Sequence, residues 1–224
     1  SITGTVSSSV ASGTYNYIIT AFNSTSSSTA TVSATATGTI IVTNTNINSQ
    51  SGYNYNTVQI GEQIWFSENL KETKYQNGIN IPLIDDTDEW SNTNTPAYII
   101  INGYYLYNYY ASSSSSNICP TGYRVPTSDD YQTLFDYVKG DNSYYQLGVD
   151  LLNDGVSGFK AINDTYIGKD GQTYLEDPLS RFQTKTLDRW AIVGNINIDN
   201  PFTQVNNYNS GTEKNGYCVR CIKI

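Results

Sequence analysis

The chain has 224 residues, of which 38% are hydrophobic and only 14% are charged. Globular intracellular chains usually carry about 25% charged residues, so this polar, weakly charged composition fits an extracellular β-protein better than a cytosolic enzyme. The net charge of -8 repels phosphate backbones and no basic stripe is present, which excludes nucleic acid as a partner. No apolar run approaches the ~20 residues that span a bilayer.

Residues 1–44 are predicted to form two or three β-strands. The run GTYNYIITAF, Gly13 to Phe22, alternates between two faces with period 2 and is rich in β-favouring residues. Small polar residues from Asn23 to Ser28 predict a turn, and Thr29 to Val42 predicts a return to strand. A disordered Ser/Thr-rich linker is the alternative that this composition leaves open.

The next segment, residues 45–52, has no hydrophobic period and is interpreted as a linker. From residue 53 onward Trp, Pro, Cys and acidic residues appear, so residues 53–224 are assigned to a second domain. Within it, Tyr55 to Leu70 predicts two strands joined by a turn at Gly61.

One segment of the second domain, Pro126 to Gly140, carries a full set of helix signals. Thr127 or Ser128 provides a cap, acidic residues occupy the first turn, and the glycine ends the helix. Residues 142–215 look turn-rich, and residues 216–224 predict a terminal strand. One main helix with many short strands predicts an α+β domain.

Two resemblances to known families cover most of the chain. The motifs GTYNY and GTIIV in residues 1–44 resemble the last half of immunoglobulin-like repeats of bacterial surface proteins, which implies a partial all-β immunoglobulin-like segment. The motifs TVQIGEQIWFSENL, CPTGYRVPT and VRC in residues 53–224 resemble the Fibrobacter succinogenes major paralogous domain (FISUMP). That resemblance implies a C-type-lectin-like fold, shared with formylglycine-generating enzymes. Because Ser1 is not an initiator Met, we expect the chain to begin inside a longer or processed product.

The three cysteines predict one disulfide. Cys218 and Cys221 lie three residues apart in a predicted strand, about 10 Å, which is too far for a disulfide. The FISUMP pattern has one cysteine in the CPTGYRVPT-like motif and one in the VRC-like motif, so the resemblance implies a Cys119–Cys221 pair. Cys218 then remains a thiol outside the disulfide, with a small buried side chain as its ordinary role.

No enzyme is predicted. The formylglycine-generating enzymes carry two reactive cysteines near a similar terminal strand, but here the disulfide consumes Cys221, and the sequence has no histidine to act as a base. No hydrolase or zinc motif is present either.

No cofactor is predicted, apart from a candidate calcium site, because calcium needs only oxygen ligands. The candidate ligands are carboxylates and an amide in two acidic segments: Asp85, Asp86, Asp88, Asp199 and Asn200. Solvated acidic loops are the alternative interpretation.

Aromatic residues between 140 and 215 are the candidate ligand-binding set, because exposed Tyr and Trp offer rigid, amphipathic contact area. They are Tyr144, Tyr145, Tyr166, Tyr174, Trp190 and Tyr208. Aromatic clusters packed beneath long loops are the alternative.

Together these features predict an extracellular protein of a cell or virion surface, acting as an adhesin or receptor-binding tip for a glycan or a cell-surface protein. The alternative is a structural subunit of a filament, fibre or virion decoration, in which a neighbouring subunit completes residues 1–44 by strand exchange.

Overall fold

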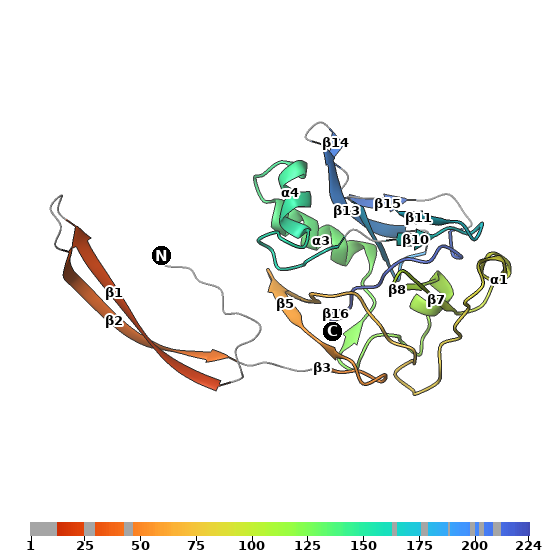
Figure 1. Ribbon diagram of the computed structural model, residues 1–224, viewed down its shortest axis with the longest axis horizontal. Helices are drawn as coiled ribbons and strands as arrows, with labels where there is room; N and C mark the ends of the chain where they lie inside the picture. Colours follow the sequence, from red (N-terminus) through yellow and green to blue (C-terminus); the bar gives the residue numbers. More distant parts are fainter. Residues whose placement is uncertain are drawn as a thin grey trace. The chain divides into compact units, whose positions relative to one another are not determined.

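The computed structural model describes residues 13–24, 30–42, 47–162, 165–175, 179–187, 189–197, 200–201, 204–207 and 212–224 (Figure 1). The chain divides into two compact units, Ser1–Asn46 and Ile47–Ile224. In the first unit, β1 (Gly13–Ser24) pairs with the antiparallel strand β2 (Ala30–Val42), and the register shifts by one residue at Ala21/Phe22. The period-2 alternation therefore identified these strands correctly.

The second unit begins inside the segment that was interpreted as a linker. β3 (Ile47–Asn48) pairs with β4 (Asn54–Tyr55), and residues 49–52 form the turn between them. The backbone N–H of Ser51 donates a hydrogen bond of 3.0 Å to Oε2 of the buried Glu72. Backbone pairing and hydrogen bonds with Glu72 and Thr73 hold this hairpin, and none of these produces a hydrophobic period in the sequence.

A four-stranded sheet lies at the centre of the second unit, in the order β5 (Thr57–Ile60), β6 (Gln63–Phe66), β16 (Ile222–Lys223) and β9 (Tyr123–Arg124). Gly61 makes the predicted turn between β5 and β6, with a φ of 60° that favours glycine. Trp65 and Phe66 are both fully buried, in two different hydrophobic clusters. Adjacent residues of a strand point to opposite faces, so both faces of this sheet are covered.

The predicted main helix is α3 (Ser128–Lys139), which covers one of those two clusters. Thr127 caps it: the threonine hydroxyl accepts from the Asp130 backbone, and the Asp130 carboxylate accepts from the Thr127 backbone. Tyr131, Leu134 and Phe135 are buried at a spacing of three and four residues, and Gly140 is the C-cap, as its position predicted.

Three shorter helices were not predicted: α1 (Thr87–Asn92), α2 (Tyr109–Ser112) and α4 (Tyr144–Leu151). The interpretation of residues 142–215 as turn-rich therefore missed α4. Ser143 caps α4 by accepting from the Gln146 backbone, and Leu147 and Leu151 are buried against the core. Gly148 lowers the intrinsic helix propensity of this segment, and packing beside α3 (Figure 1) compensates for it.

The remaining strands form small antiparallel sheets, which gives the α+β class that was expected. β7 (Tyr98–Ile101) pairs with β8 (Tyr104–Tyr107), and β10 (Thr165–Ile167) pairs with β11 (Thr173–Leu175). β13 (Arg189–Asn197) lies between β12 (Leu179–Gln183) on one side and β14 (Asn200–Pro201) and β15 (Gln204–Asn207) on the other. None of the helices described is long and apolar enough to cross a membrane.

Candidate ligand-binding surface

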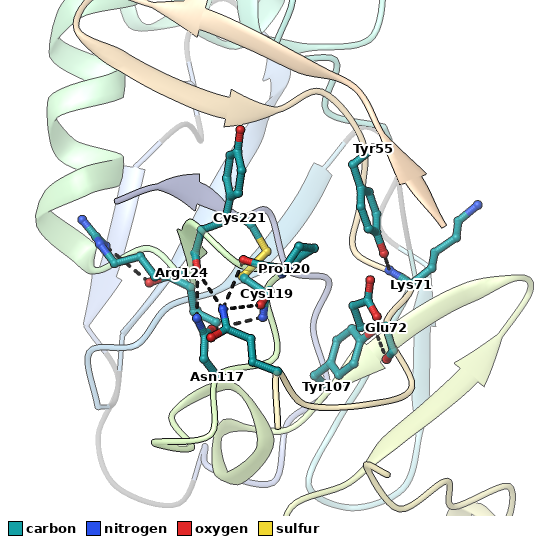
Figure 2. The surroundings of a disulfide bond; sticks show 12 residues. Tyr55, Lys71, Glu72, Tyr107, Asn117, Cys119, Pro120, Arg124 and Cys221 are labelled. Atoms are coloured by element: carbon teal, nitrogen blue, oxygen red, sulfur yellow. Dashed lines mark hydrogen bonds between the residues drawn. A yellow bond between two sulfur atoms is a disulfide. The ribbon is translucent and has the colours of Figure 1, made fainter. Parts of the chain in front are cut away.

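A disulfide between Cys119 and Cys221 fixes the segment before α3 to the C-terminal segment, with the Cα atoms 6.0 Å apart (Figure 2). The loop around Cys119 is held by two amide side chains. Gln76 donates to the carbonyls of Cys119 and Pro120, and Asn117 donates to that of Tyr123. This part of the second unit is therefore a rigid frame for the surfaces around it.

The remaining cysteine, Cys218, is fully buried. It belongs to the hydrophobic cluster that α3 covers, whereas Cys221 belongs to the other cluster. The two cysteines therefore face opposite sides, which agrees with their spacing in an extended segment.

Three of the six predicted aromatic residues come together in the structure, namely Tyr166 on β10, Tyr174 on β11 and Trp190 on β13. Tyr145 is half-buried on α4, and the side chain of Tyr144 and all of Tyr208 lie outside the described residues. The sequence therefore identified the members of a cluster but not which of them lie together.

We call the side chains of Tyr166, Tyr174, Arg181, Trp190 and Tyr217 the aromatic surface. Tyr166 stacks on Tyr174, with ring centroids 4.7 Å apart, and Trp190 stacks on Tyr217 at 5.4 Å. The Arg181 guanidinium lies 4.3 Å from the Tyr166 ring and 4.6 Å from the Trp190 ring. This cation–π arrangement links the two stacks into one rigid group.

Exposure divides the aromatic surface into a presented part and a supporting part. Tyr174 is 37% exposed, Tyr166 is half-buried, and Trp190 is only 5% exposed. Trp190 is buried because Tyr217 stacks on its ring and the Arg181 guanidinium lies over it, within a small hydrophobic cluster. The tryptophan therefore supports the surface from beneath and does not present a free ring, contrary to what its position in a loop-rich stretch suggested.

A polar edge borders the exposed tyrosine. The Tyr174 hydroxyl donates a hydrogen bond of 2.9 Å to Oδ2 of Asp170, and the Gln172 backbone donates to Oδ1 at 3.0 Å. The hydrogen bond to Asp170 raises the pKa of the Tyr174 phenol, and the hydrogen bonds from Gln172 and Tyr174 lower the pKa of the Asp170 carboxyl. An exposed ring beside a fixed carboxylate combines an apolar face with a hydrogen-bond acceptor.

Sequence reasoning missed Arg181, Tyr217 and Asp170. A charged residue between the apolar positions of LSRFQ was a usable signal for Arg181, since such a residue on a buried strand needs partners. Tyr217 precedes the CVRC motif, which drew attention only to its cysteines. Asp170 carried no signal, because only the turn before β11 brings it to Tyr174.

The candidate calcium ligands do not form a common site in the described part of the chain. Asp85, Asp86 and Asp88 are exposed around the start of α1, where Asp86 Oδ1 caps the helix by accepting from the Glu89 backbone. Asp199 lies outside the described residues, and for Asn200 only the backbone, in β14, is described. No group of three or more carboxylate or cysteine side chains suited to a metal ion occurs among the described residues.

The fold and the disulfide define this chain as a small-sheet α+β protein with a covalently locked frame. It belongs to the Fibrobacter succinogenes major domain family, whose model matches residues 58–223. No curated protein and no solved structure gave a significant match. The family points to a surface-associated protein, and the disulfide is consistent with an extracellular location.

Proposed function

We propose that this protein is an extracellular adhesin or receptor-binding tip that recognises a glycan or a protein through its aromatic surface. The observation that carries the proposal is the stack of Tyr166 on the exposed Tyr174, with Arg181 holding Tyr166 in place. A preorganised ring loses little conformational entropy when a ligand covers it. A sugar is the favoured ligand class, because its C–H face can lie on Tyr174 while a hydroxyl donates to Asp170.

The test is a glycan array probed with the complete 224-residue chain and with two matched variants. Tyr174→Ala removes the exposed ring of the aromatic surface, and Tyr137→Ala removes a tyrosine that is 64% exposed on α3, outside that surface. The proposal expects Tyr174→Ala to weaken binding at least tenfold, since burial of an aromatic ring is worth ~1.5–3 kcal/mol. Equal binding by both variants would move the ligand to another face.

Binding without catalysis is part of the same proposal. The chain has no histidine, and the only cysteine outside the disulfide among its three is fully buried at position 218, where a thiolate cannot reach a substrate. Copper and oxygen should therefore support no oxidation of a peptide cysteine. Turnover that disappears in Cys218→Ser would replace the binding proposal with an oxidase.

The first unit favours a second candidate, a subunit of an extracellular assembly. In the described residues, β1 and β2 pair only with each other, although they are 12 and 13 residues long. A two-stranded sheet is marginally stable alone, and its edges accept further strands. Strand exchange between copies predicts concentration-dependent oligomers in sedimentation experiments, whereas a stalked adhesin predicts a monomer at every concentration.

A further inference from the structure

A cavity of about 250 Å³ lies in the second unit, apart from the aromatic surface. Its walls come from the segment after β6, the β7–β8 turn and start of β8, the loop after α4, and the C-terminal segment. The lining residues are Ser67, Glu68, Asn69, Leu70, Lys71, Gly103, Tyr104, Tyr105, Asn153, Lys160, Ile162 and Arg220. Drug-sized ligands occupy pockets of about 300–1,000 Å³, so this cavity suits a smaller molecule, such as one sugar ring.

The charge of this cavity is opposite to that of the chain. Three cations, Lys71, Lys160 and Arg220, line it against one carboxylate, Glu68, whereas the whole chain has a net charge of -8. Within the described part of the chain, neither lysine lies in an ion pair. A cluster of cations inside an acidic protein attracts an anion locally.

The one carboxylate already has hydrogen-bond donors outside the cavity lining. Glu68 Oε2 accepts from the Tyr53 hydroxyl at 2.9 Å, and Oε1 accepts from the backbone and side-chain nitrogens of Asn56 at 2.9 and 3.1 Å. Tyr53 and Asn56 do not line the cavity. Both oxygens are therefore engaged by these two residues. The Lys71 ammonium donates to the Tyr53 hydroxyl at 3.4 Å and lies 4.9 Å from the centre of the Tyr53 ring. A hydrogen bond of this length is weak, so an anion in the cavity can compete with Tyr53 for Lys71.

Arg220 holds the cavity floor in place. Its buried guanidinium donates to Oδ1 of Asn69 at 2.7 Å and to the carbonyl of Lys160 at 2.7 Å, and it also donates to the carbonyl of Phe159. Lys160 has a φ of 55°, in the left-handed region that non-glycine residues seldom adopt. Such strain persists only where the surroundings impose it, and it is concentrated at ligand sites; here the guanidinium imposes it.

From these observations we propose that the cavity binds a small sugar bearing a single carboxylate, through the ammonium groups of Lys71 and Lys160. The two lysines match one negative charge, given that Glu68 lies nearby. Tyr104 and Tyr105 offer ring faces, and the amide of Asn153 matches a sugar hydroxyl. This site is separate from the aromatic surface, so the two proposals stand or fall independently.

The experiment titrates the complete chain with D-glucuronate, with D-glucose as its neutral counterpart, and with inorganic phosphate, monitored by calorimetry and by amide chemical shifts. Glucuronate should bind and shift the amides of residues 67–71 and 160–162, glucose should bind at least tenfold more weakly, and phosphate should not displace glucuronate. Charged hydrogen bonds of ~1.5–3 kcal/mol correspond to this difference. Stronger binding of phosphate, or equal binding of the two sugars, would overturn the assignment.

Two charge-removing variants complete the test. The double variant Lys71→Gln with Lys160→Gln should lose at least tenfold in glucuronate affinity at an unchanged melting temperature, since glutamine adopts a positive φ no less readily than lysine. Lys223→Gln changes an exposed lysine that does not line the cavity and should bind like the parent chain. Unchanged affinity in the double variant, or absence of glucuronate binding in the parent chain, would refute the site.

Discussion

The ring of Tyr166 lies against that of Tyr174 at 4.7 Å, with their planes inclined by only 13°. Tyr174 is the exposed member of the pair, and Tyr166 also contacts Arg181 and Tyr217. The exposed ring is thus the outer end of a group whose inner members are fixed. This arrangement separates residues that present a contact surface from residues that only support it.

Stability measurements should show that separation. Trp190→Ala should lower the free energy of unfolding by about 3–5 kcal/mol, because a large buried ring is lost. Tyr174→Ala removes a ring that is 37% exposed and should cost about 1 kcal/mol or less. Urea unfolding of both variants measures the contrast, and equal losses would assign Tyr174 to the core.

Intact mass before and after alkylation tests the cysteine assignment. Without reductant the native chain should take up no alkylating reagent, because Cys218 is fully buried. In urea without reductant it should take up one label. Reduction should destabilise the chain by about 4.7 kcal/mol in the chain-entropy model, since Cys119 and Cys221 are separated by 102 residues. Three labels without reductant would disprove the disulfide.

The start of α3 predicts a pH dependence. Burial raises the pKa of the Asp130 carboxyl, but hydrogen bonds from Arg124 and Thr127 outweigh burial and lower it. A lowered folded-state pKa stabilises the protein above the ordinary Asp pKa of ~3.9, and this stabilisation disappears as the pH falls through the folded-state pKa. Asp130→Asn should therefore cost about 1 kcal/mol at pH 7 and less at low pH.

Its control is Asp136→Asn. Asp136 accepts from Gln132 on the exposed face of α3, near the end of the helix, where a negative charge opposes the helix dipole. Urea unfolding at neutral and acidic pH should show no loss for this variant. A pH-independent cost for Asp130→Asn would mean that the carboxylate charge contributes nothing.

Arg220 should stabilise the folded chain through the hydrogen bonds of its guanidinium as well as through its charge. Replacement by Met leaves the Asn69 amide oxygen and the Lys160 carbonyl without this donor, and a buried acceptor left unsatisfied costs about 1–3 kcal/mol. We expect a total loss of about 3 kcal/mol or more. Arg189→Met, at an exposed position on β13, should stay within about 0.5 kcal/mol of the parent chain.

Hydrogen exchange should distinguish the two units. Backbone amides of residues 15–21 in β1 belong to a sheet of two strands, which is marginal alone. Amides of residues 219–222 lie beside the disulfide and the central sheet. The first group should exchange far faster in the complete chain at low concentration, and equal protection would mean that the first unit is self-sufficient.

Local signals in the sequence predicted some elements well. α3 has a cap, acidic residues in its first turn and a terminal glycine, and each acts within a few residues of the chain. α4 has only a serine cap and contains Gly148, so its helical form depends on packing that no short segment encodes. The β3–β4 hairpin was missed for the same reason, because Ser51 in its turn bonds to Glu72, which lies 21 residues away in the sequence.

In the candidate site, too, some features follow from the local sequence and others only from packing between distant segments. The sequence provided the aromatic residues, but contacts with Tyr217 and Arg181 decide that Trp190 is buried, whereas Tyr174 stays exposed. Arg181 belongs to the site only because strand register places it between two rings. The cavity around Lys71 and Lys160 collects segments from across the second unit, and composition could not reveal it.

The Cys119–Cys221 bond encloses every residue of the aromatic surface, from Tyr166 to Tyr217, within one covalent ring. A protease that cuts a single peptide bond within this ring produces two fragments that the disulfide still joins. Nicked protein should therefore migrate as one species without reductant and separate into two pieces only when reduced. One cut between Cys119 and Cys221 therefore does not release the aromatic surface from the rest of the second unit.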